Sequence, residues 1–171
     1  MRKSIRVVGM SKGEVELKGK EVFRERISFE LLILNMLRDI WVAFTNVRWW
    51  FEGEAYPLFI NDLETVDRML NVLISFLEGV EELKEDIRKE IHENKELKEL
   101  YEKYVEEFEN AGNVDSPYMV QREELYRDNL MESGDTYAQY IARKIKAIIS
   151  ILDKHDLLLR EREFYRGAEI Q

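Results

Sequence analysis

The stretch PLFINDLETVDRMLNVLISFLEGVEELKEDIRKEI, residues 57–91, decides the fold because its apolar side chains recur at helical spacing. Steps of three or four residues separate them, with one step of seven. The set is Phe59, Leu63, Val66, Leu70, Leu73, Leu77, Val80, Ile87 and Ile91. This spacing lines one face of a helix, and a proline fits the first helical turn. The stretch therefore predicts a helix from Pro57 to about Ile91 that forms the seam of an antiparallel bundle.

A helix is also predicted upstream, from about Ser28 to Trp50, where Gly53 then ends it. One apolar stripe has the i, i+3, i+4 spacing of a buried face: Phe29, Leu32, Ile33, Met36, Leu37, Ile40, Trp41, Phe44 and Val47. A second apolar face consists of Leu31, Leu34, Val42 and Trp49. A helix that is apolar on two sides needs cover on two sides, so we expect its own bundle on one side and another subunit on the other.

The rest of the chain predicts further helices. Residues 94–108 form a third, more polar helix, and AGNVDSPY, residues 111–118, forms a loop. A shorter helix fills 119–131, ESGD at 132–135 breaks it, and a last helix runs from Asp135 or Thr136 to about Tyr165. The predicted fold class is all-α, an antiparallel four-helix-type bundle over residues 27–166, with an extended arm or hairpin at 1–26 and a tail at 167–171.

Composition agrees with a single helical domain. The 171 residues include only 2 Pro and 8 Gly, and 36% are charged, a mix that favours helices and is typical of thermostable proteins. The absence of cysteine suits a reducing compartment. The N-terminus lacks the apolar segment of a signal peptide, and charges interrupt the longest apolar stretch, residues 29–44. We therefore expect a cytoplasmic protein that does not enter the membrane.

Charge is distributed unevenly along the chain. Residues 1–26 hold eight bases and four acids, a net charge of about +4, which leaves about −13 for the remainder of a chain with net charge −9. A basic arm can hold nucleic acid locally through Arg2, Lys3, Arg6 and Lys12, although the acidic body repels it. In the alternative interpretation, SIRVV (4–8) and EVELKGKEVF (14–23) pair as strands or lie on a neighbouring subunit. The four interspersed acids favour this alternative.

Two segments resemble a known family. RWWFEGEAYPLF, residues 48–59, is similar to the end of the first helix and the following turn in Dps proteins, ferritin-like mini-cages that protect DNA. Trp49, Gly53, Tyr56 and Phe59 occupy the matching places. GDTYAQYIARKIKAIISILDKHDLLLRE, residues 134–161, resembles the last helix of that family, with Asp153, Lys154 and His155 as its signature. The resemblance implies a ferritin-like oligomer and, for some members, a basic tail that binds DNA.

The iron chemistry of that family is not implied. Its metal site needs two histidines and several carboxylates, whereas the matching positions here are Arg48, Ile60, Glu64, Ser75 and Gly79. Only Glu64 among them can ligate a metal ion, and Arg48 places a positive charge where the iron would lie. We therefore predict a bundle without a ferroxidase site, without a cofactor and without an assigned catalytic residue, which acts as an oligomeric structural or binding protein.

Two other classes of function remain open. A Mg²⁺-dependent all-α nucleotide hydrolase needs paired carboxylates; Glu64 and Asp67 precede Glu82 and Glu85 here, the reverse of the order in such enzymes. A helical adaptor for a partner protein is the other alternative. The acids that recur every third residue from Glu93 to Glu102 alternate with lysines, as on a solvated helix face.

The Arg88–His92 pair and the aromatic segment at residues 48–50 can each be interpreted as structural rather than catalytic. Arg88 and His92 are one turn apart among charged neighbours, which predicts a surface pair. Trp49 and Trp50 point about 100° apart on a helix, so one can enter the core while the other meets a neighbour. Arg48 can lie on an aromatic face. We therefore predict a packing corner and subunit contact at Arg48, Trp49 and Trp50.

Overall fold

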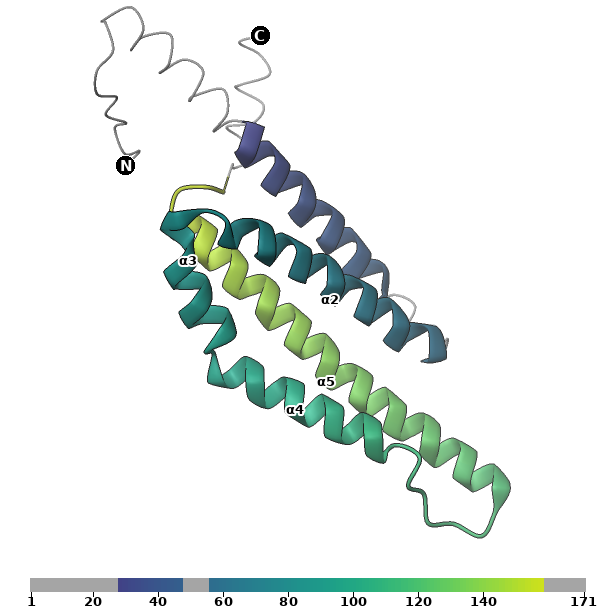
Figure 1. Ribbon diagram of the computed structural model, residues 1–171. Coiled ribbons are helices and arrows are strands. Elements are labelled where there is room, and N and C mark those ends of the chain that lie inside the picture. Colours follow the sequence, from purple (N-terminus) through teal and green to yellow (C-terminus); the bar gives the residue numbers. More distant parts are fainter. Residues whose placement is uncertain (1–27, 48–55, 159–171) are drawn as a thin grey trace, which may run out of the picture. The chain divides into compact units, whose positions relative to one another are not determined.

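The computed structural model describes residues 28–47 and 56–158, and every regular element in these ranges is helical (Figure 1). No strand occurs in this part of the chain, so the all-α prediction is confirmed for it. Contacts divide the chain into two units. One unit consists of Asp39–Ile151, and the other consists of Met1–Arg38 and Leu152–Gln171. The predicted arm at 1–26, the corner at 48–50 and the tail at 167–171 lie outside the described residues.

The first described helix covers residues 28–47. Its buried side chains follow steps of four and three residues along one stripe: Ile33, Leu37, Ile40, Phe44 and Val47. Leu32 and Trp41, which the spacing placed in this stripe, are instead largely exposed, as is Val42 of the second apolar face. The buried stripe is therefore narrower than the sequence predicted, and its edges face solvent.

Helix α2 (Tyr56–Glu78) buries the predicted seam, and Leu63, Val66, Leu70, Leu73 and Leu77 are almost fully inaccessible. The predicted continuation to Ile91 is wrong. Gly79 and Val80 form a two-residue turn in which Val80 N–H donates to Leu77 O at 3.0 Å and the Val80 backbone is extended, before α3 (Glu81–Ile87) begins. The predicted seam also left out Leu83, which lies between Val80 and Ile87 and is fully buried in α3.

A π-helical turn, η1 (Arg88–His92), follows α3 directly. Its closing bond runs from Glu93 N–H to Arg88 O at 2.8 Å, five residues back. Helix α4 (Lys95–Asn110) then starts behind Asn94, whose side-chain oxygen accepts from Leu97 N–H at 3.2 Å while its amide donates to Glu90 O at 2.9 Å. The third predicted helix is thus confirmed to within two residues at each end.

Helix α5 (Met119–Lys154) is continuous, so the break predicted at ESGD is wrong. The loop at residues 111–118 before it is confirmed. Ser133 and Thr136 donate to the carbonyls of Leu130 and Glu132, at 2.8 and 3.2 Å, and so satisfy their hydroxyls inside the helix. Thr136 also lies 3.1 Å from both carboxylate oxygens of Glu107 on α4. This tertiary anchor offsets the weak helix propensity of the segment.

The end of α5 differs from the prediction that it reaches about Tyr165. Asp156 has a positive φ of 53° and ends the helix in the left-handed conformation. Asp156 N–H donates to Asp153 O at 3.1 Å and Leu157 N–H to Leu152 O at 2.9 Å, the two bonds of a Schellman motif. An aspartate at the position that usually carries glycine explains why the sequence did not reveal this stop.

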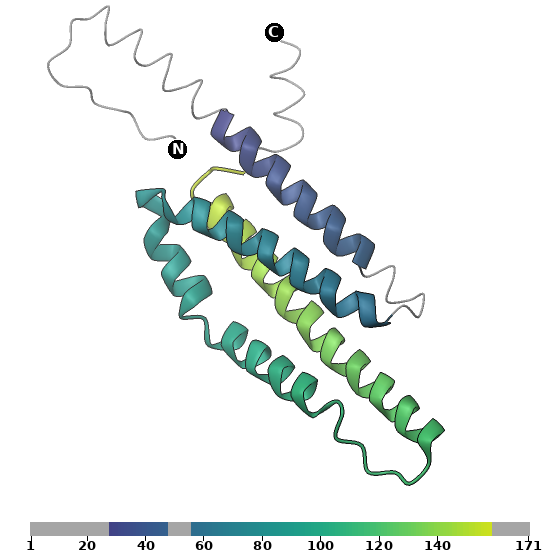
Figure 2. The ribbon, with the colours of Figure 1, turned by 45° about the vertical axis from the view of Figure 1, so that its right-hand side comes forward.

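The helices α2, α4 and α5 lie side by side (Figures 1 and 2). Contacts between α4 and α5 run in opposite sequence directions, from Glu96 with Arg143 to Glu107 with Thr136, so these two helices are antiparallel. Contacts between α2 and α5 run in the same direction, from Asp67 with Tyr137 to Asn71 with Lys144. Helix α4 therefore runs antiparallel to α2 as well.

The ferritin-like topology that the resemblance implied is not confirmed by this order and stays a prediction. A ferritin-like bundle has one long crossover connection, whereas two residues join α2 to α3 and an eight-residue loop joins α4 to α5. Short connections between antiparallel neighbours are those of an up-and-down arrangement instead.

Candidate binding cleft

An open cleft of about 480 Å³ lies among α2, the end of η1, α4 and α5. Its volume falls in the range of small-molecule sites. Apolar side chains form part of the wall, with Ile74 from α2 and Leu97 from α4. Polar groups converge from all four segments, so the cleft combines a hydrophobic wall with a small set of placed donors and acceptors.

A buried ion pair forms the floor of the cleft. Lys144 Nζ donates to Asp67 Oδ1 at 3.0 Å, to Asn71 Oδ1 at 2.7 Å and to Tyr140 Oη at 3.2 Å. The side chains of Lys144 and Asp67 are only 6% and 13% exposed. An ammonium has three N–H donors, and all three have acceptors here, which offsets the cost of removing the charge from water.

Tyr137 is a further hydrogen-bond donor to Asp67. Its hydroxyl donates to Asp67 Oδ2 at 2.9 Å, so both carboxylate oxygens accept from α5. Burial, followed by the negative charge of Asp67, raises the pKa of Tyr137 well above its usual range. The phenol therefore stays neutral and remains a donor.

Four tyrosines from α4 and α5 form an aromatic cluster beside this pair. Tyr104 packs edge-on against Tyr137 with ring centres 4.1 Å apart, and Tyr101 lies 5.3 Å from Tyr140. Burial, then the negative charge of Glu64, raises the pKa of Tyr104 to about 12. The cluster holds α4 against α5 next to the floor of the cleft.

The mouth of the cleft carries exposed charges on α4. Lys98 and Glu102 lie one turn apart on this helix, and both line the cleft with Tyr101 between them in sequence. Neighbouring lysines on α4 are paired, Lys95 with Glu99 at 4.0 Å and Lys103 with Glu107 at 3.7 Å. Lys98 and Glu102 form no ion pair with any residue in the described ranges.

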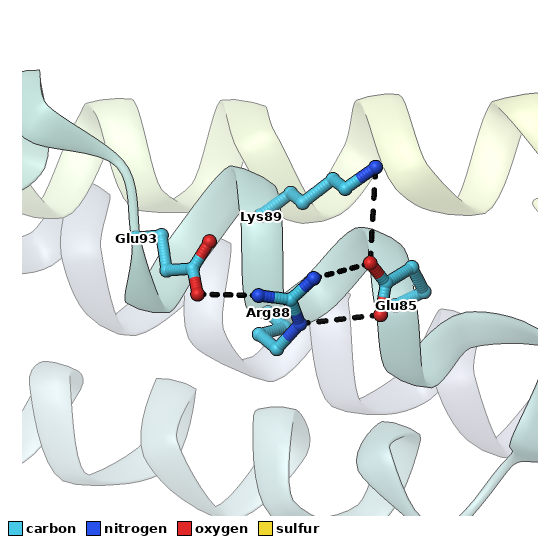
Figure 3. Close-up of polar contacts among 4 residues, drawn as sticks. All are labelled: Glu85, Arg88, Lys89 and Glu93. Carbon is cyan, nitrogen blue, oxygen red and sulfur yellow. Dashed lines mark hydrogen bonds and ion pairs between the residues drawn. The ribbon is translucent and has the colours of Figure 1, made fainter.

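At the other side of the mouth, His92 of η1 pairs with Glu78 at the end of α2. Arg88, one turn earlier, does not face His92: its guanidinium lies between the carboxylates of Glu85 and Glu93 (Figure 3). Lys89 adds a contact of 3.7 Å to Glu85. The predicted surface character of Arg88 and His92 is confirmed, and each has its own acidic partner.

Glu64, the predicted metal ligand, lies on α2 and pairs with Arg68 at 4.0 Å. In residues 28–47 and 56–158 no group of three or more histidine and carboxylate side chains is arranged to hold a metal ion. Ligation by Glu64 stays a prediction. The interface residues Arg48, Trp49 and Trp50 and the arm residues Arg2, Lys3, Arg6 and Lys12 lie outside the described ranges, and their roles also stay predictions.

Of the residues at the floor of the cleft, only Asp67 was named from the sequence, as a carboxylate of the alternative hydrolase, and the buried ion pair was not predicted. The sequence does contain a pattern that could have predicted this pair. Asp67 lies beside Val66 and Leu70 on the apolar face of α2, and Lys144 lies between Ile141 and Ile148 on the apolar face of α5. A lone acid and a lone base on the apolar stripes of two helices predict a buried pair. The partners Asn71, Tyr137 and Tyr140 follow only once the helices are aligned.

Comparison with protein-family models, with curated proteins and with solved structures gave no match to this chain. Within the described ranges, no helix combines the length and the apolar character that a membrane crossing requires.

Proposed function

We propose that this chain is a ligand-binding helical protein without catalytic activity, and that its cleft takes a small zwitterionic molecule. The proposal rests on the difference between the buried charges at the floor of the cleft and the exposed charges at its mouth. The buried charges of Asp67 and Lys144 pair with each other and are hydrogen-bonded within the protein, while the charges at the mouth, Lys98 and Glu102, are unpaired in the described part of the chain.

The ion pair at the floor of the cleft, Asp67 with Lys144, is suited to a structural role and not to catalysis. For Lys144 to act as a nucleophile or base it would have to lose a proton that is shared with Asp67, Asn71 or Tyr140. A proton taken up by Asp67 would remove its negative charge and so break the charged hydrogen bond from the Lys144 ammonium. Each of these steps breaks a buried hydrogen bond, which makes the pair a poor catalyst and a good support.

The mouth supplies complementary charges to a dipolar ligand. Residues at i and i+4 on a helix have Cβ atoms about 5–6 Å apart, so Lys98 and Glu102 present opposite charges at short range. The ring of Tyr101 lines the same wall and offers an apolar face to the carbon skeleton of the ligand. An amino acid, with its carboxylate and ammonium, is the simplest molecule of this class.

The test is a thermal-unfolding screen of the whole chain with each of the standard amino acids at about 10 mM. Acetate and ethylammonium, which carry one charge each, serve as controls. A ligand at about 100 times its Kd stabilises the folded state by about 2.7 kcal/mol, which a melting curve resolves easily. At least one zwitterion should raise the melting temperature while both controls leave it unchanged.

Matched variants on α4 localise the effect. Lys98→Ala and Glu102→Gln should abolish the shift, whereas Lys95→Ala and Glu99→Gln, which alter a pair outside the lining of the cleft, should retain it. A screen without any stabilising zwitterion, or a shift that persists in Lys98→Ala and Glu102→Gln, would refute the proposal.

The sequence also predicted an oligomer, a ferritin-like topology and, as an alternative, a Mg²⁺-dependent hydrolase, and these three expectations differ in their support. The oligomeric character implied by the Dps resemblance remains part of the proposal, supported by the exposed apolar side chains Leu32, Trp41 and Val42 of the first helix. Its ferritin-like topology has less support, because a turn of only two residues joins α2 to α3. The Mg²⁺-dependent hydrolase is less favoured, since Glu64, Asp67 and Glu85 each pair with a basic side chain of this chain, Arg68, Lys144 and Arg88.

A further inference from the structure

Lys144 fixes the hydrogen-bonding direction of two side chains that line the cleft. Its Nζ donates to Asn71 Oδ1 at 2.7 Å and to Tyr140 Oη at 3.2 Å. An ammonium can only donate, so the amide of Asn71 must turn its oxygen toward Lys144 and its NH2 group away from it. The Tyr140 oxygen accepts from Lys144, which leaves the O–H of the same hydroxyl to donate elsewhere.

Both of these donors are available to a ligand. In the described ranges, neither the NH2 group of Asn71 nor the O–H of Tyr140 has a hydrogen-bond acceptor. Asn71 is exposed and Tyr140 is half-buried, and both line the cleft. Because both side chains contact the same ammonium nitrogen, they are neighbours. The wall of the cleft therefore carries a pair of uncharged donors, Asn71 Nδ2 and Tyr140 Oη, beside the buried ion pair.

We propose that this donor pair binds the carbonyl oxygen of a side-chain amide, so that the ligand of the cleft is asparagine or glutamine. This assignment rests on the proposed function, in which Lys98 and Glu102 bind the carboxylate and the ammonium of an amino acid. A carbonyl oxygen has two lone pairs and can accept from both donors at once. The cleft is open, so water can accept from the N–H groups of the ligand amide.

The donor pair lies close to the charges at the mouth. Lys98 and Glu102 flank Tyr101 in the sequence of α4, and all three line the cleft. The ring centre of Tyr101 lies 5.3 Å from that of Tyr140, so these two rings are in contact. A ligand held by its charges at the mouth therefore needs only a short side chain to reach the donors.

Charge favours a neutral acceptor over a carboxylate at this position. Asn71 and Tyr140 are uncharged, and the nearby ammonium of Lys144 is already paired with Asp67 at 3.0 Å. A ligand carboxylate here would face the negative charge of Asp67 and lose part of its own hydration. Aspartate and glutamate should therefore bind more weakly than the two amides. An apolar side chain of the same size should also bind more weakly, because it leaves both donors without an acceptor.

The experiment is isothermal titration calorimetry of the whole chain with asparagine, leucine and aspartate, whose side chains have nearly the same shape. Glutamine, methionine and glutamate form a second series with a longer side chain. In at least one series the amide should bind with a Kd about tenfold lower than that of the apolar amino acid, the difference expected for two neutral hydrogen bonds. The Kd of the acidic amino acid should also exceed that of the amide.

Two variants locate the preference for the amide. Asn71→Asp removes the NH2 group but keeps an oxygen for Lys144, and Tyr140→Phe removes the O–H. Each should reduce the preference over the apolar amino acid to about threefold, because one of the two hydrogen bonds is lost. The matched controls are Asn61→Asp and Tyr126→Phe, at exposed positions of α2 and α5 outside the lining of the cleft. Both controls should keep the tenfold preference.

The outcomes separate this assignment from the proposed function. Equal binding of the amides and their apolar counterparts would overturn the assignment and leave the proposed function standing. A preference that Asn71→Asp and Tyr140→Phe both preserve would do the same, as would tighter binding of the acidic amino acids. Where a variant does not fold, the two ligand series on the wild type decide alone. Binding of no amino acid at all would refute the proposed function and the assignment with it.

Discussion

Lys144 Nζ lies 3.0 Å from Asp67 Oδ1, and this ion pair joins the middle of α5 to α2 inside the protein. The two residues are 77 positions apart in the chain. Burying a single charge is costly, but a pair with filled hydrogen bonds can be neutral in its net effect on stability. The bond therefore fixes which turns of α2 and α5 meet, more than it adds to the free energy of folding.

The first prediction follows from this difference between one buried charge and a buried ion pair. Lys144→Met leaves the Asp67 carboxylate buried without its cation and should lower the free energy of unfolding by about 3–5 kcal/mol. Asp67→Leu should cost a similar amount, because it leaves the ammonium unpaired. The double variant Asp67→Leu/Lys144→Met should cost less than either single one. Urea denaturation of the four proteins measures this cycle.

Lys146→Met serves as the control, because Lys146 lies on the exposed side of α5. It should change the stability by less than about 0.5 kcal/mol. Additive losses in the double variant would show that Lys144 and Asp67 do not depend on each other and would contradict this account of the pair.

Alkaline pH should destabilise the protein through its buried tyrosines. A tyrosine in the unfolded chain ionises near pH 10, whereas the pKa of Tyr104 in the folded protein is raised to about 12 and that of Tyr137 higher still. The raised values mean that the stabilising contribution is complete below pH 10 and is lost as pH rises through about 12. Each such group should lower the free energy of unfolding by up to about 1.4 kcal/mol per pH unit in this window.

Phenylalanine variants separate the two tyrosines. Tyr104→Phe should make the decline between pH 10 and 12 less steep, which equilibrium unfolding at several pH values measures. Tyr137→Phe should also remove the hydrogen bond to Asp67 and cost about 1.5–3 kcal/mol already at pH 7. An unchanged pH profile in both variants would show that neither phenol resists ionisation.

Apolar periodicity accounts for most of what the sequence predicted correctly. The stripes of α2 and α5, and the existence and extent of α4, follow from side chains that recur at helical spacing, because burial on one face is what stabilises a surface helix. Trp41 shows the limit of this reasoning, since an apolar residue at the edge of the stripe can face solvent.

The helix boundaries and the polar residues of the cleft depend on contacts between helices, which the spacing of apolar residues along the sequence does not reveal. The segment at Ser133 has poor helix propensity, but Thr136 bonds to Glu107 of another helix and the helix continues. Gly79 ends α2 although the apolar pattern resumes beyond it. In the same way, Asn71 gains its role only from the approach of Lys144, which lies on a helix far away in sequence.

The Arg88 network gives a prediction on an exposed site. Hydrogen bonds from Arg88, followed by its positive charge, lower the pKa of Glu85, and Lys89 contributes less. Arg88→Ala should therefore return the Glu85 pKa to its ordinary range, with little change in melting temperature. Lys89→Ala should shift it less. An NMR titration of the Glu85 side chain measures both; equal shifts in the two variants would contradict the dominance of Arg88.

Asp156 ends α5 in a conformation that most side chains avoid. At φ 53° its Cβ is crowded by the backbone, and glycine removes this crowding. Asp156→Gly should therefore raise the free energy of unfolding by up to about 1 kcal/mol, while Asp156→Val should lower it by about 1–2 kcal/mol. The control is Asp153→Gly, three residues earlier inside the helix, which should cost about 1 kcal/mol because glycine is unfavourable there. Thermal and urea unfolding of the three variants measure these differences. Destabilisation by glycine at both positions would mean that the helix continues past Asp156 and that the Schellman motif does not form.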